Sequence, residues 1–597
     1  MTRSRKIWES DTQMIFMKRA FLTILLFTAI TSVSGQGYRT MSVWHNGEAK
    51  DYPLVTFDSL AAAQREGKAM IYYNRNLNYS KPKVDSVIYA EIDSITVWNP
   101  EIESTNRRTV KELILERKSI VSFKKTSYKK IGNHNPLMGH KFGADPFGMV
   151  DGDRLYVYMT DDHLYKSTDG KPITAAWDYS DCKNVTIISS DDLVNWTDHG
   201  TQPVAGSGGS APWAVNMWAP CAAHKTINGK EKYFMYFSNN SSGIGVLTSD
   251  TPYGPWTDPL GKALVNHNTE NCSASVVPSV YDPAVLIDDD GKAYLYFGGG
   301  IDNLNAADPR SARCVQLGDN MTSIVGTPIE IRPPCLFEDA GINKIGGKYL
   351  YSYCSNFQAD GGPGRGNVGY MESDNPLGPF TYVDCCSDNP GGASWAGGGG
   401  NHHHAFVEFK GKYYALYHTR TLKSAMRSSN PDINDNVELR STCLSVLKVD
   451  TVNARITRLT TSDITEQGVS QLKNFNPYQT VPGATMAWEN GVTTNYNKRT
   501  NLCTADFKSG SWIGLSKVDL AEGPVGFTAK VKGQGILAVL SDAPSSAGTM
   551  IAIAEVDSPS EYTEIRVPLV NRLKGVQDEL YITSTGNMSL ESWSFVK

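Results

Sequence analysis

Residues 281–297 read YDPAVLIDDDGKAYLYF. A short acidic motif at 281–283 precedes a polar turn at 288–291 and an aromatic-rich stretch at 293–297. Apolar residues that alternate on both sides of an Asp-Gly turn are typical of a β-hairpin. The same order of motif, turn and strand recurs, and the other four copies are ADP (144–146) with LYVYM (155–159), WAP (218–220) with YFMYF (233–237), FED (337–339) with YLYSY (349–353), and HHH (402–404) with YYALY (413–417).

The spacing of these copies predicts a β-propeller. The motifs are 56 to 74 residues apart when they are counted from Asp145, Ala219, Asp282, Glu338 and His403. Such an interval suits one four-stranded propeller blade with insertions. A series of generic β-sandwiches is the alternative, and the fivefold recurrence favours the propeller. We predict an all-β fold, with a five-bladed β-propeller, a following β-sandwich (jelly roll) and a small N-terminal β-rich module.

The remaining sequence divides the chain into four parts. The pair Lys18-Arg19, an apolar run at 20–30 and small residues at 31–35 predict a secretory signal within residues 1–36. The run is too short to span a bilayer, so we expect a secreted or periplasmic protein with no membrane span after signal removal. We assign 37–125 to the accessory module, 126–468 to the propeller and 469–597 to the β-sandwich.

Composition narrows the function classes. The chain of 597 residues carries 57 basic and 62 acidic side chains, and such a balance gives no basic patch for a nucleic-acid partner. Aromatic residues make up 10% of the chain, which suits either a β-rich protein or sugar binding. None of the ten cysteines forms a CxxC pair, which argues against a zinc site.

Three motifs begin with a carboxylate, at Asp145, Asp282 and Glu338. The innermost strand of each blade lines the propeller channel, so side chains at equivalent positions converge on the axis. Clustered carboxylates raise one another's pKa, which is costly for a purely structural purpose. Glycoside hydrolysis needs such a set, with one carboxylate as base and another kept protonated as acid. Alternatively, each residue alone is a turn cap or solvated acid, or the cluster holds a hard cation.

The motifs together resemble glycoside hydrolase family 43, most closely its arabinoxylan arabinofuranohydrolases. The resemblance covers about residues 130–460 and rests on KFGADP (141–146), WAP (218–220), YDPA (281–284) and FEDAGINK (337–344). It implies an inverting mechanism on a five-bladed propeller. By motif, Asp145 corresponds to the general base, Glu338 to the general acid, and Asp282 to the carboxylate that tunes and orients that acid.

The resemblance also implies further site residues. The segment NHHHA (401–405) is similar to a channel motif that often holds a calcium ion, largely through water, and His403 is its best match. Consecutive strand residues point to opposite faces, so the three histidines do not share one zinc ion. Arg440, in LRST (439–442), matches an active-site arginine, although a surface ion pair is the alternative. Trp218 is expected either to form a wall of the sugar pocket or to pack in the core.

The C-terminal part resembles carbohydrate-binding module family 6. The similar stretches are MAWE (486–489), KSGSWI (508–513) and LESWSF (590–595). The resemblance makes Trp512 a candidate sugar-stacking platform, with Tyr562 and Asn587 as weaker candidates. Pro482 and Ala484 stand where that family has acidic residues near a calcium ion, so we expect no ion there.

These observations predict a secreted hydrolase that removes α-L-arabinofuranosyl side chains from arabinoxylan, without an organic cofactor. A β-xylosidase or an arabinan-active exo-glycosidase on the same fold is the nearest alternative. A carbohydrate-binding propeller without catalysis is the alternative of another class. It would be expected to lack one of the carboxylates, and all three are present.

Overall fold

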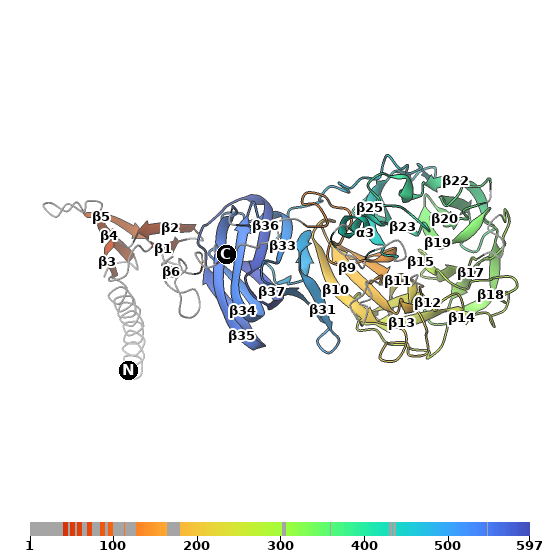
Figure 1. Ribbon diagram of the computed structural model, residues 1–597, viewed down its shortest axis with the longest axis horizontal. Coiled ribbons are helices and arrows are strands. Elements are labelled where there is room, and N and C mark those ends of the chain that lie inside the picture. The colour runs from red at the N-terminus through yellow and green to blue at the C-terminus, as the bar shows by residue number, and fades with distance from the viewer. Residues whose placement is uncertain are drawn as a thin grey trace, which may run out of the picture. The chain divides into compact units, whose positions relative to one another are not determined.

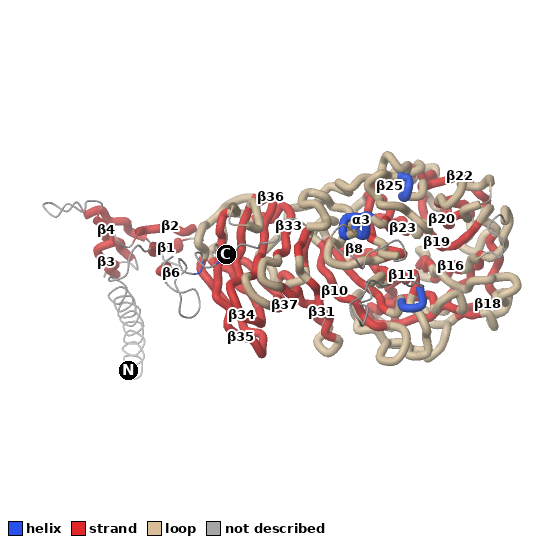
Figure 2. The backbone as a smooth tube through the Cα atoms, in the orientation of Figure 1, coloured by secondary structure: helices blue, strands red, loops and turns tan. Residues whose placement is uncertain are grey.

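A computed structural model describes residues 127–163, 179–300, 306–358, 360–427, 438–545 and 547–597, with the strands of residues 40–98 and four single positions (Figures 1 and 2). The chain separates into two compact units, with residues 1–119 and 553–555 in the first and all others in the second. The predicted signal segment, 1–36, lies outside the described residues. None of the helices in the described part has the length and apolar character needed to cross a membrane.

The described residues between 40 and 98 in the first unit are strands. They form two antiparallel sheets of three strands, in the orders β2-β1-β6 and β3-β4-β5. The strands are β1 (Thr40–His45), β2 (Glu48–Pro53), β3 (Phe57–Ala62), β4 (Ala69–Asn74), β5 (Val84–Tyr89) and β6 (Ser94–Trp98).

The predicted five-bladed propeller is confirmed. Each blade is an antiparallel sheet that begins at one of the five sequence motifs. The blades are, in order, β7 (Ala144–Asp151), β8 (Arg154–Thr160), β9 (Asn184–Ser190) and β10 (Trp196–Pro203); β11 (Trp218–Ile227), β12 (Lys230–Ser238), β13 (Gly243–Ser249) and β14 (Val265–Asn266); β15 (Ala284–Ile287), β16 (Ala293–Phe297), β17 (Ala312–Leu317) and β18 (Ile324–Ile331); β19 (Leu336–Ile345), β20 (Lys348–Ser355), β21 (Val368–Ser373) and β22 (Thr381–Ser387); β23 (His404–Phe409), β24 (Lys412–Thr419) and β25 (Ser441–Leu447).

Turn chemistry explains the first hairpin of several blades. Asn228-Gly229, Gly346-Gly347 and Lys410-Gly411 each have positive φ at both positions, between 50° and 77°. Two-residue hairpin turns with this conformation match the twist of the flanking strands. In these three blades, a turn pair that ends in glycine therefore fixes the hairpin register that brings the motif to the channel.

The recurring tyrosines join neighbouring blades. Tyr236 of blade 2 donates its hydroxyl hydrogen to the carbonyl of Met321 in blade 3 at 2.7 Å, and Tyr296 of blade 3 donates to Pro376 in blade 4 at 2.6 Å. Tyr158 of blade 1 donates in the same way to Pro252 in blade 2. All three side chains are fully buried, and a buried hydroxyl needs a hydrogen-bond partner. Each of these hydroxyls has its partner in the next blade, so the tyrosines link neighbouring blades.

The C-terminal strands form one continuous, curled sheet of nine strands. Its curl comes from β34 (Gly526–Ser541), whose first half pairs with β37 (Met588–Val596) and whose second half pairs with β36 (Val576–Ser584). The other strands are β28 (Val481–Pro482), β30 (Trp488–Asn490), β31 (Thr493–Asn497), β32 (Leu502–Phe507), β33 (Trp512–Asp519) and β35 (Thr549–Pro568).

This sheet is bonded to the propeller. The short strand β29 (Thr485–Met486) extends blade 1 by pairing with β10. The Asn195 side chain accepts a hydrogen bond from the Ser516 amide at 2.8 Å and donates one to the Ser516 carbonyl at 3.0 Å. The Trp488 indole donates to the carbonyl of Asn133 at 2.8 Å. Backbone and side-chain bonds therefore hold the two parts together as one unit.

Trp512 corrects one prediction from the sequence. Its side chain is completely buried and packs with Val194, Ala487, Trp488 and Tyr581 between blade 1 and the C-terminal sheet. A side chain without exposed surface offers no face to a sugar ring, so Trp512 is a core residue and not a stacking platform.

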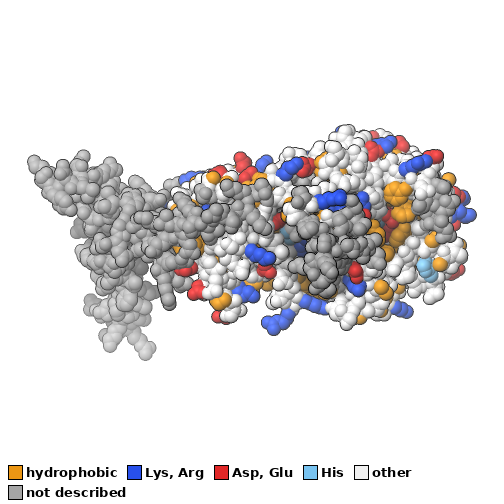
Figure 3. All heavy atoms as spheres, viewed as in Figure 1, with side chains coloured by type: hydrophobic (Ala, Val, Ile, Leu, Met, Phe, Trp, Pro, Cys, Tyr) orange, Lys and Arg blue, Asp and Glu red, His pale blue; other side chains and the backbone are white. Residues whose placement is uncertain are grey.

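The ten cysteines are all buried and unpaired. Charged side chains of both signs are intermixed over the face visible in Figure 3, in keeping with the nearly balanced totals.

Candidate active site

The site is built from a sharp backbone turn that four blades share. Asp145, Ala219, Asp282 and Asp339 have φ values of 49°, 39°, 53° and 72°, in the left-handed region that non-glycine residues rarely adopt. Three of their amides bond to a side chain at the end of the preceding blade's second strand: Asp145 to His418, Ala219 to Thr160, and Asp282 to Ser238. Strained backbone of this kind persists where the surroundings hold it, and it is characteristic of functional sites.

Glu338 differs from its predicted place in this repeat. The residue of blade 4 that shares the left-handed turn is Asp339, and Glu338 lies one position earlier, between two register shifts of the β19–β20 pairing. In sequence, Glu338 aligns with Asp145 and Asp282 because all three are the first acid of their motif. The longer glutamate side chain nevertheless reaches the same centre, as its contacts with His403 and Tyr281 show.

Asp145 is held as a carboxylate by surrounding donors. The Arg440 guanidinium approaches its Oδ1 at 2.7 Å, and the Thr160 hydroxyl donates to its Oδ2 at 2.8 Å. Burial alone would raise the pKa of Asp145, but Arg440, His403 and His418 lower it to about 2. Asp145 is therefore ionised across the working range of most enzymes.

Glu338 has the opposite environment. Burial raises its pKa to about 8; the nearby Asp282 and Asp145 carboxylates add to the rise, and His403 opposes it. Its Oε1 is buried without a hydrogen-bond partner among the described residues, while the Tyr281 hydroxyl is 3.5 Å from Oε2. Glu338 therefore holds a proton at neutral pH and has an oxygen free to donate it.

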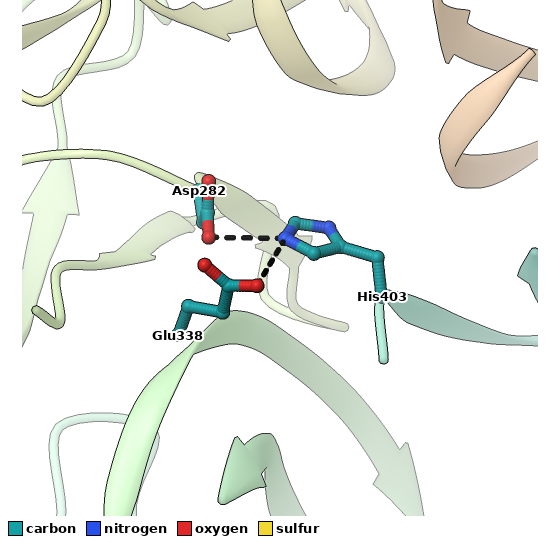
Figure 4. A group of neighbouring side chains, drawn as sticks. All are labelled: Asp282, Glu338 and His403. Carbon is teal, nitrogen blue, oxygen red and sulfur yellow. Dashed lines mark hydrogen bonds and ion pairs between the residues drawn. The ribbon is translucent and has the colours of Figure 1, made fainter. Parts of the chain in front are cut away.

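His403 lies at the centre of the carboxylates. Figure 4 shows its ring nitrogen Nε2 facing Asp282 at 3.1 Å and Glu338 at 3.8 Å. Its Nδ1 faces Asp339 at 3.4 Å and Asp145 at 3.8 Å. Burial opposes protonation of this ring, but the surrounding carboxylates raise the pKa of His403 well above its usual value. Burial also raises the pKa of Asp282 against the influence of the imidazole.

The side chains of consecutive histidines point in different directions, as the alternation along a strand predicts. Only His403 faces the three predicted carboxylates, whereas His404 bonds to Asp339 through Nδ1 and to Ser352 through Nε2 at 2.7 Å. Burial keeps the pKa of His402 well below its usual value.

Arg440 is buried beside Asp145 and does not form a surface ion pair. Its Nε and Nη2 atoms donate to the two carboxylate oxygens of Asp162 at 2.9 and 3.0 Å. Its guanidinium also lies over the Tyr179 ring, 5.3 Å from the centroid. The half-buried Trp218 meets the same tyrosine edge-on and donates its indole hydrogen to the Tyr179 carbonyl. Trp218 thus lies against Tyr179, which in turn contacts Arg440.

Sequence reasoning missed Asp162 and Asp339. Asp339 follows Phe337-Glu338 as Pro283 follows Tyr281-Asp282, so its acidic side chain was visible in the motif, but the motif has the same length and does not show that the turn has shifted. No repeat marks Asp162, since its counterpart in blade 2 is Asn240. Its role depends on a contact across 278 residues of sequence.

The donor set is suitable for a metal ion. One ligand atom from each of Asp282, Glu338 and His403 lies within 4.8 Å of the others. Carboxylate oxygens are typical ligands of hard cations, whereas a ring nitrogen is better suited to contact such an ion through water. A cation bound here would compete with the proton on His403.

The site thus contains an ionised carboxylate, Asp145, and a protonated carboxylic acid, Glu338. It also contains a third carboxyl group, Asp282, which lies against His403. A pair such as Asp145 and Glu338, with pKa values pushed apart, can activate water with one group and protonate a leaving oxygen with the other. This is the requirement of glycosidic bond hydrolysis.

Comparisons with known proteins agree with this chemistry. The sequence profile of glycosyl hydrolases family 43 matches residues 134–445, more than half of the chain. The chain is 41% identical over 498 residues to an arabinoxylan arabinofuranohydrolase of Paenibacillus polymyxa, with 78% of this chain and 74% of that protein covered. It is 38% identical over 508 residues to the Bacillus subtilis protein of the same name, with 79% and 94% covered.

A crystal structure of a family 43 arabinoxylan arabinofuranohydrolase from Bacillus subtilis, in complex with cellotetraose, superimposes with a TM-score of 0.72. The identity is 37%, and the match covers 79% of this chain and 99% of that one, so it extends beyond the propeller. The chain therefore belongs to glycosyl hydrolases family 43, and it is a glycoside hydrolase.

Proposed function

We propose that this protein removes α-L-arabinofuranosyl side chains from arabinoxylan by single displacement with inversion. The observation that carries the acid/base part is the separation of two pKa values in one site, about 2 for Asp145 and about 8 for Glu338. The substrate rests on relatives at 38–41% identity that are named arabinoxylan arabinofuranohydrolases.

In this mechanism Asp145 takes a proton from a water molecule, whose oxygen attacks the anomeric carbon. Glu338 gives its proton to the glycosidic oxygen as the bond to the anomeric carbon breaks. The new bond forms on the face opposite the leaving group, so the anomeric configuration inverts.

The other site residues position these two groups. Arg440 holds the Asp145 carboxylate, and its two hydrogen bonds to the Asp162 carboxylate fix the guanidinium plane. The amide of Asp339 donates to Asp282 at 3.1 Å, which keeps that carboxyl group directed at the Glu338 side of the centre. Asp282 then keeps the pKa of Glu338 high through its negative charge. We assign Trp218 to the wall that meets the sugar.

One Ca²⁺ ion fits this proposal at His403, held mainly through water. Such an ion would supply positive charge at the channel centre, where four carboxyl groups meet one imidazole. Dialysis against a chelator, followed by thermal unfolding with and without added calcium, tests this point. A midpoint that calcium restores supports the ion, and an unchanged midpoint removes it from the proposal.

Secretion through the signal at 1–36 is part of the proposal, since the substrate polysaccharide lies outside cells. A carbohydrate-binding module role for residues 469–597 is supported by the sequence resemblance and by Tyr562. The Tyr562 ring is half-buried, the Lys532 ammonium lies 5.2 Å from its centroid, and its hydroxyl forms a hydrogen bond with Ser589 at 2.8 Å. Asn587, two positions before Ser589, is exposed.

The substrate is tested by chromatography of the sugars released from wheat arabinoxylan. We expect arabinose from the wild type and from Asp319→Asn, a control at a fully exposed carboxylate. Glu338→Gln and Asp145→Asn should each lose about 10²- to 10⁴-fold in rate, the usual contribution of a general acid or base. Release of xylose instead would contradict the arabinose assignment and favour a β-xylosidase. Release of no sugar from arabinoxylan, arabinan or xylo-oligosaccharides would contradict the whole proposal.

Leaving-group dependence separates the acid from the base. A 4-nitrophenyl α-L-arabinofuranoside has a leaving group that departs without protonation. Glu338→Gln should therefore lose far less activity on this compound than on arabinoxylan, whereas Asp145→Asn should lose activity on both. Equal losses for Glu338→Gln on the two substrates would contradict its role as the acid.

A further inference from the structure

A second groove opens on the outer side of blade 2, apart from the carboxylate centre. It has a volume of about 680 Å³ and is lined by residues of two loops, 209–213 and 255–261, and by Lys498 of the C-terminal sheet. Its lining includes Ser210, Trp213, Trp256, Thr257, Asp258 and Lys498. We call it the Trp213 groove.

The aromatic floor of this groove is fixed in place. The Trp213 indole donates its hydrogen to Asp258 Oδ2 at 2.6 Å, and its ring packs against Phe237 with centroids 6.1 Å apart. Asp258 is itself held, since its Oδ1 accepts from the amides of Leu260 and Gly261 at 2.8 and 2.9 Å. Trp213 is half-buried, so it presents ring surface to the groove without rotamer freedom to lose on binding.

The C-terminal sheet closes one end of the groove. The Asn501 side chain, next to the start of β32, donates to the carbonyl of Gly254 at 2.7 Å. This bond fixes the β31–β32 turn against blade 2 and brings Lys498 to the groove. The lining is therefore assembled from three segments that lie far apart in sequence, which distinguishes it from an incidental surface hollow.

The chemistry of this lining matches a neutral sugar chain. Sugar rings present C–H faces that pack on an indole, and their hydroxyl groups need polar partners at the rim. Ser210, Thr257 and Lys498 supply such partners around Trp213, and the Asp258 carboxylate is already engaged with Trp213. The volume is within the range of small-molecule sites, about 300–1,000 Å³.

The groove is connected to the catalytic centre by a short, anchored segment. Trp213 and Trp218 are five positions apart, and the amides of Val215 and Asn216 between them both donate to Asn239 Oδ1. Trp218 then contacts Tyr179, which lies against Arg440. A polymer bound in the groove would therefore be kept near the site of hydrolysis.

We propose that the Trp213 groove is a second binding site for the main chain of the substrate polysaccharide, a neutral xylan-type chain. This inference rests on the proposed function for the identity of the polymer. Because the groove holds the polymer apart from the reacting bond, it lowers KM for long substrates and leaves small arabinofuranosides unaffected.

Binding and kinetics of Trp213→Ala and Trp213→Phe test this site. In native gels that contain linear xylan, we expect Trp213→Ala to weaken retardation by about 5- to 30-fold in dissociation constant, as for loss of an aromatic anchor. The Phe variant keeps a ring and should retain part of the binding. On arabinoxylan, Trp213→Ala should raise KM with kcat unchanged, and its kcat/KM on 4-nitrophenyl α-L-arabinofuranoside should stay within about twofold of the wild type.

Phe380→Ala is the matched control. Phe380 is half-buried like Trp213, and it ends the segment NPLGPF (375–380) of blade 4, which corresponds to TPYGPW (251–256) of blade 2. This variant should bind xylan like the wild type. Unchanged retardation for Trp213→Ala, or an equal loss for Phe380→Ala, would overturn the proposal. A parallel loss on the small substrate would also overturn it, because the effect would then be structural.

The gel assay needs no hydrolysis, so it separates the two proposals. A wild type that cleaves no arabinofuranoside but is retarded through Trp213 contradicts the proposed function and supports the groove. A wild type that cleaves the substrate but is not retarded contradicts the groove and leaves the proposed hydrolysis standing.

Discussion

At the scale of single residues, the site depends on local environments that give two similar carboxyl groups very different pKa values. Asp145 and Glu338 are both buried carboxyl groups, yet one lies against a guanidinium and the other has an unpaired oxygen beside further carboxylates. Burial raises both pKa values, and only Asp145 has a cation close enough to reverse the effect. The chemistry therefore follows from neighbours and not from the two side chains themselves.

The pH profile tests the part played by Arg440. Activity needs Asp145 ionised and Glu338 protonated, so the acid limb of kcat/KM follows Asp145 and the alkaline limb follows Glu338, near pH 8. In Arg440→Lys the ammonium cannot bond Asp162 twice and also reach Asp145, so the pKa of Asp145 should rise. We expect the acid limb to move to higher pH while the alkaline limb stays in place. A shift confined to the alkaline limb would contradict this assignment.

The stability of the wild type against Glu338→Gln tests the raised pKa. An ordinary glutamate has a pKa of 4.5, and that of folded Glu338 is about 8. Between these values the folded state holds a proton that the unfolded state lacks, so Glu338 makes stability fall as pH rises. Gln does not titrate, so the variant should gain in melting temperature relative to the wild type from about pH 4.5 to pH 8. A constant difference over that range would show that Glu338 is not protonated by its surroundings.

At the scale of elements, each blade contributes its innermost strand to the channel and its second strand to the joint with the next blade. Residues after the hairpin turns are therefore under two constraints. The hydroxyl of a buried tyrosine must find its acceptor, and the side chain that ends the second strand must accept a hydrogen bond from the amide at the next motif, as Ser238 does from Asp282.

Tyr236→Phe tests the joints between blades. The change removes one hydroxyl and leaves the Met321 carbonyl unpaired in the core, which should cost about 1–3 kcal/mol of unfolding free energy. Urea denaturation measures this loss. Tyr351→Phe is the control, because that buried hydroxyl has no hydrogen-bond partner in the described part of the chain. Equal stabilities for the two variants would show that the tyrosine joint contributes nothing.

The sequence was informative wherever local pattern determines structure. The blades, their hairpin turns and the convergence of Asp145, Asp282 and His403 follow from a repeated order of motif, turn and strand. The exact register of Glu338 did not follow, because a bulge in β19 shifts the turn to Asp339 and leaves no trace in a motif of equal length. Trp512 was misassigned because sequence similarity to a sugar-binding segment does not report which face of β33 lies against blade 1.

At the scale of the whole molecule, the propeller and the C-terminal sheet are one mechanical unit. The sheet extends blade 1 through β29, buries Trp512 and Trp488 at the junction, and closes the Trp213 groove through Asn501. Asp145 lies on β7, in the same blade as β10, which carries this junction. A substitution that weakens the junction should therefore also destabilise the propeller and lower the activity.

Asn195→Ala tests this coupling. The variant loses both bonds to Ser516 and leaves the buried Ser516 amide unpaired, at a cost of about 1–3 kcal/mol, while the Ser516 carbonyl keeps its bond from Gln471. Calorimetry should show one transition for the wild type and a lower melting temperature for the variant, with catalytic activity lost in the same transition. As a control, Asn453→Ala removes an exposed side chain that bonds only within its own turn, and it should change little. An unchanged melting temperature for Asn195→Ala would contradict a shared unit.

The most direct test of the central claim, that Asp145 and Glu338 hydrolyse arabinofuranosyl bonds by a single displacement, is the configuration of the first sugar released. Proton NMR of wheat arabinoxylan during the first minutes of hydrolysis measures it before mutarotation. We predict that the β-anomer of arabinose appears first with the wild type and that Glu338→Gln and Asp145→Asn release almost none. Initial release of the α-anomer would mean retention through a covalent intermediate, and it would contradict the assignment of Asp145 as a base that activates water.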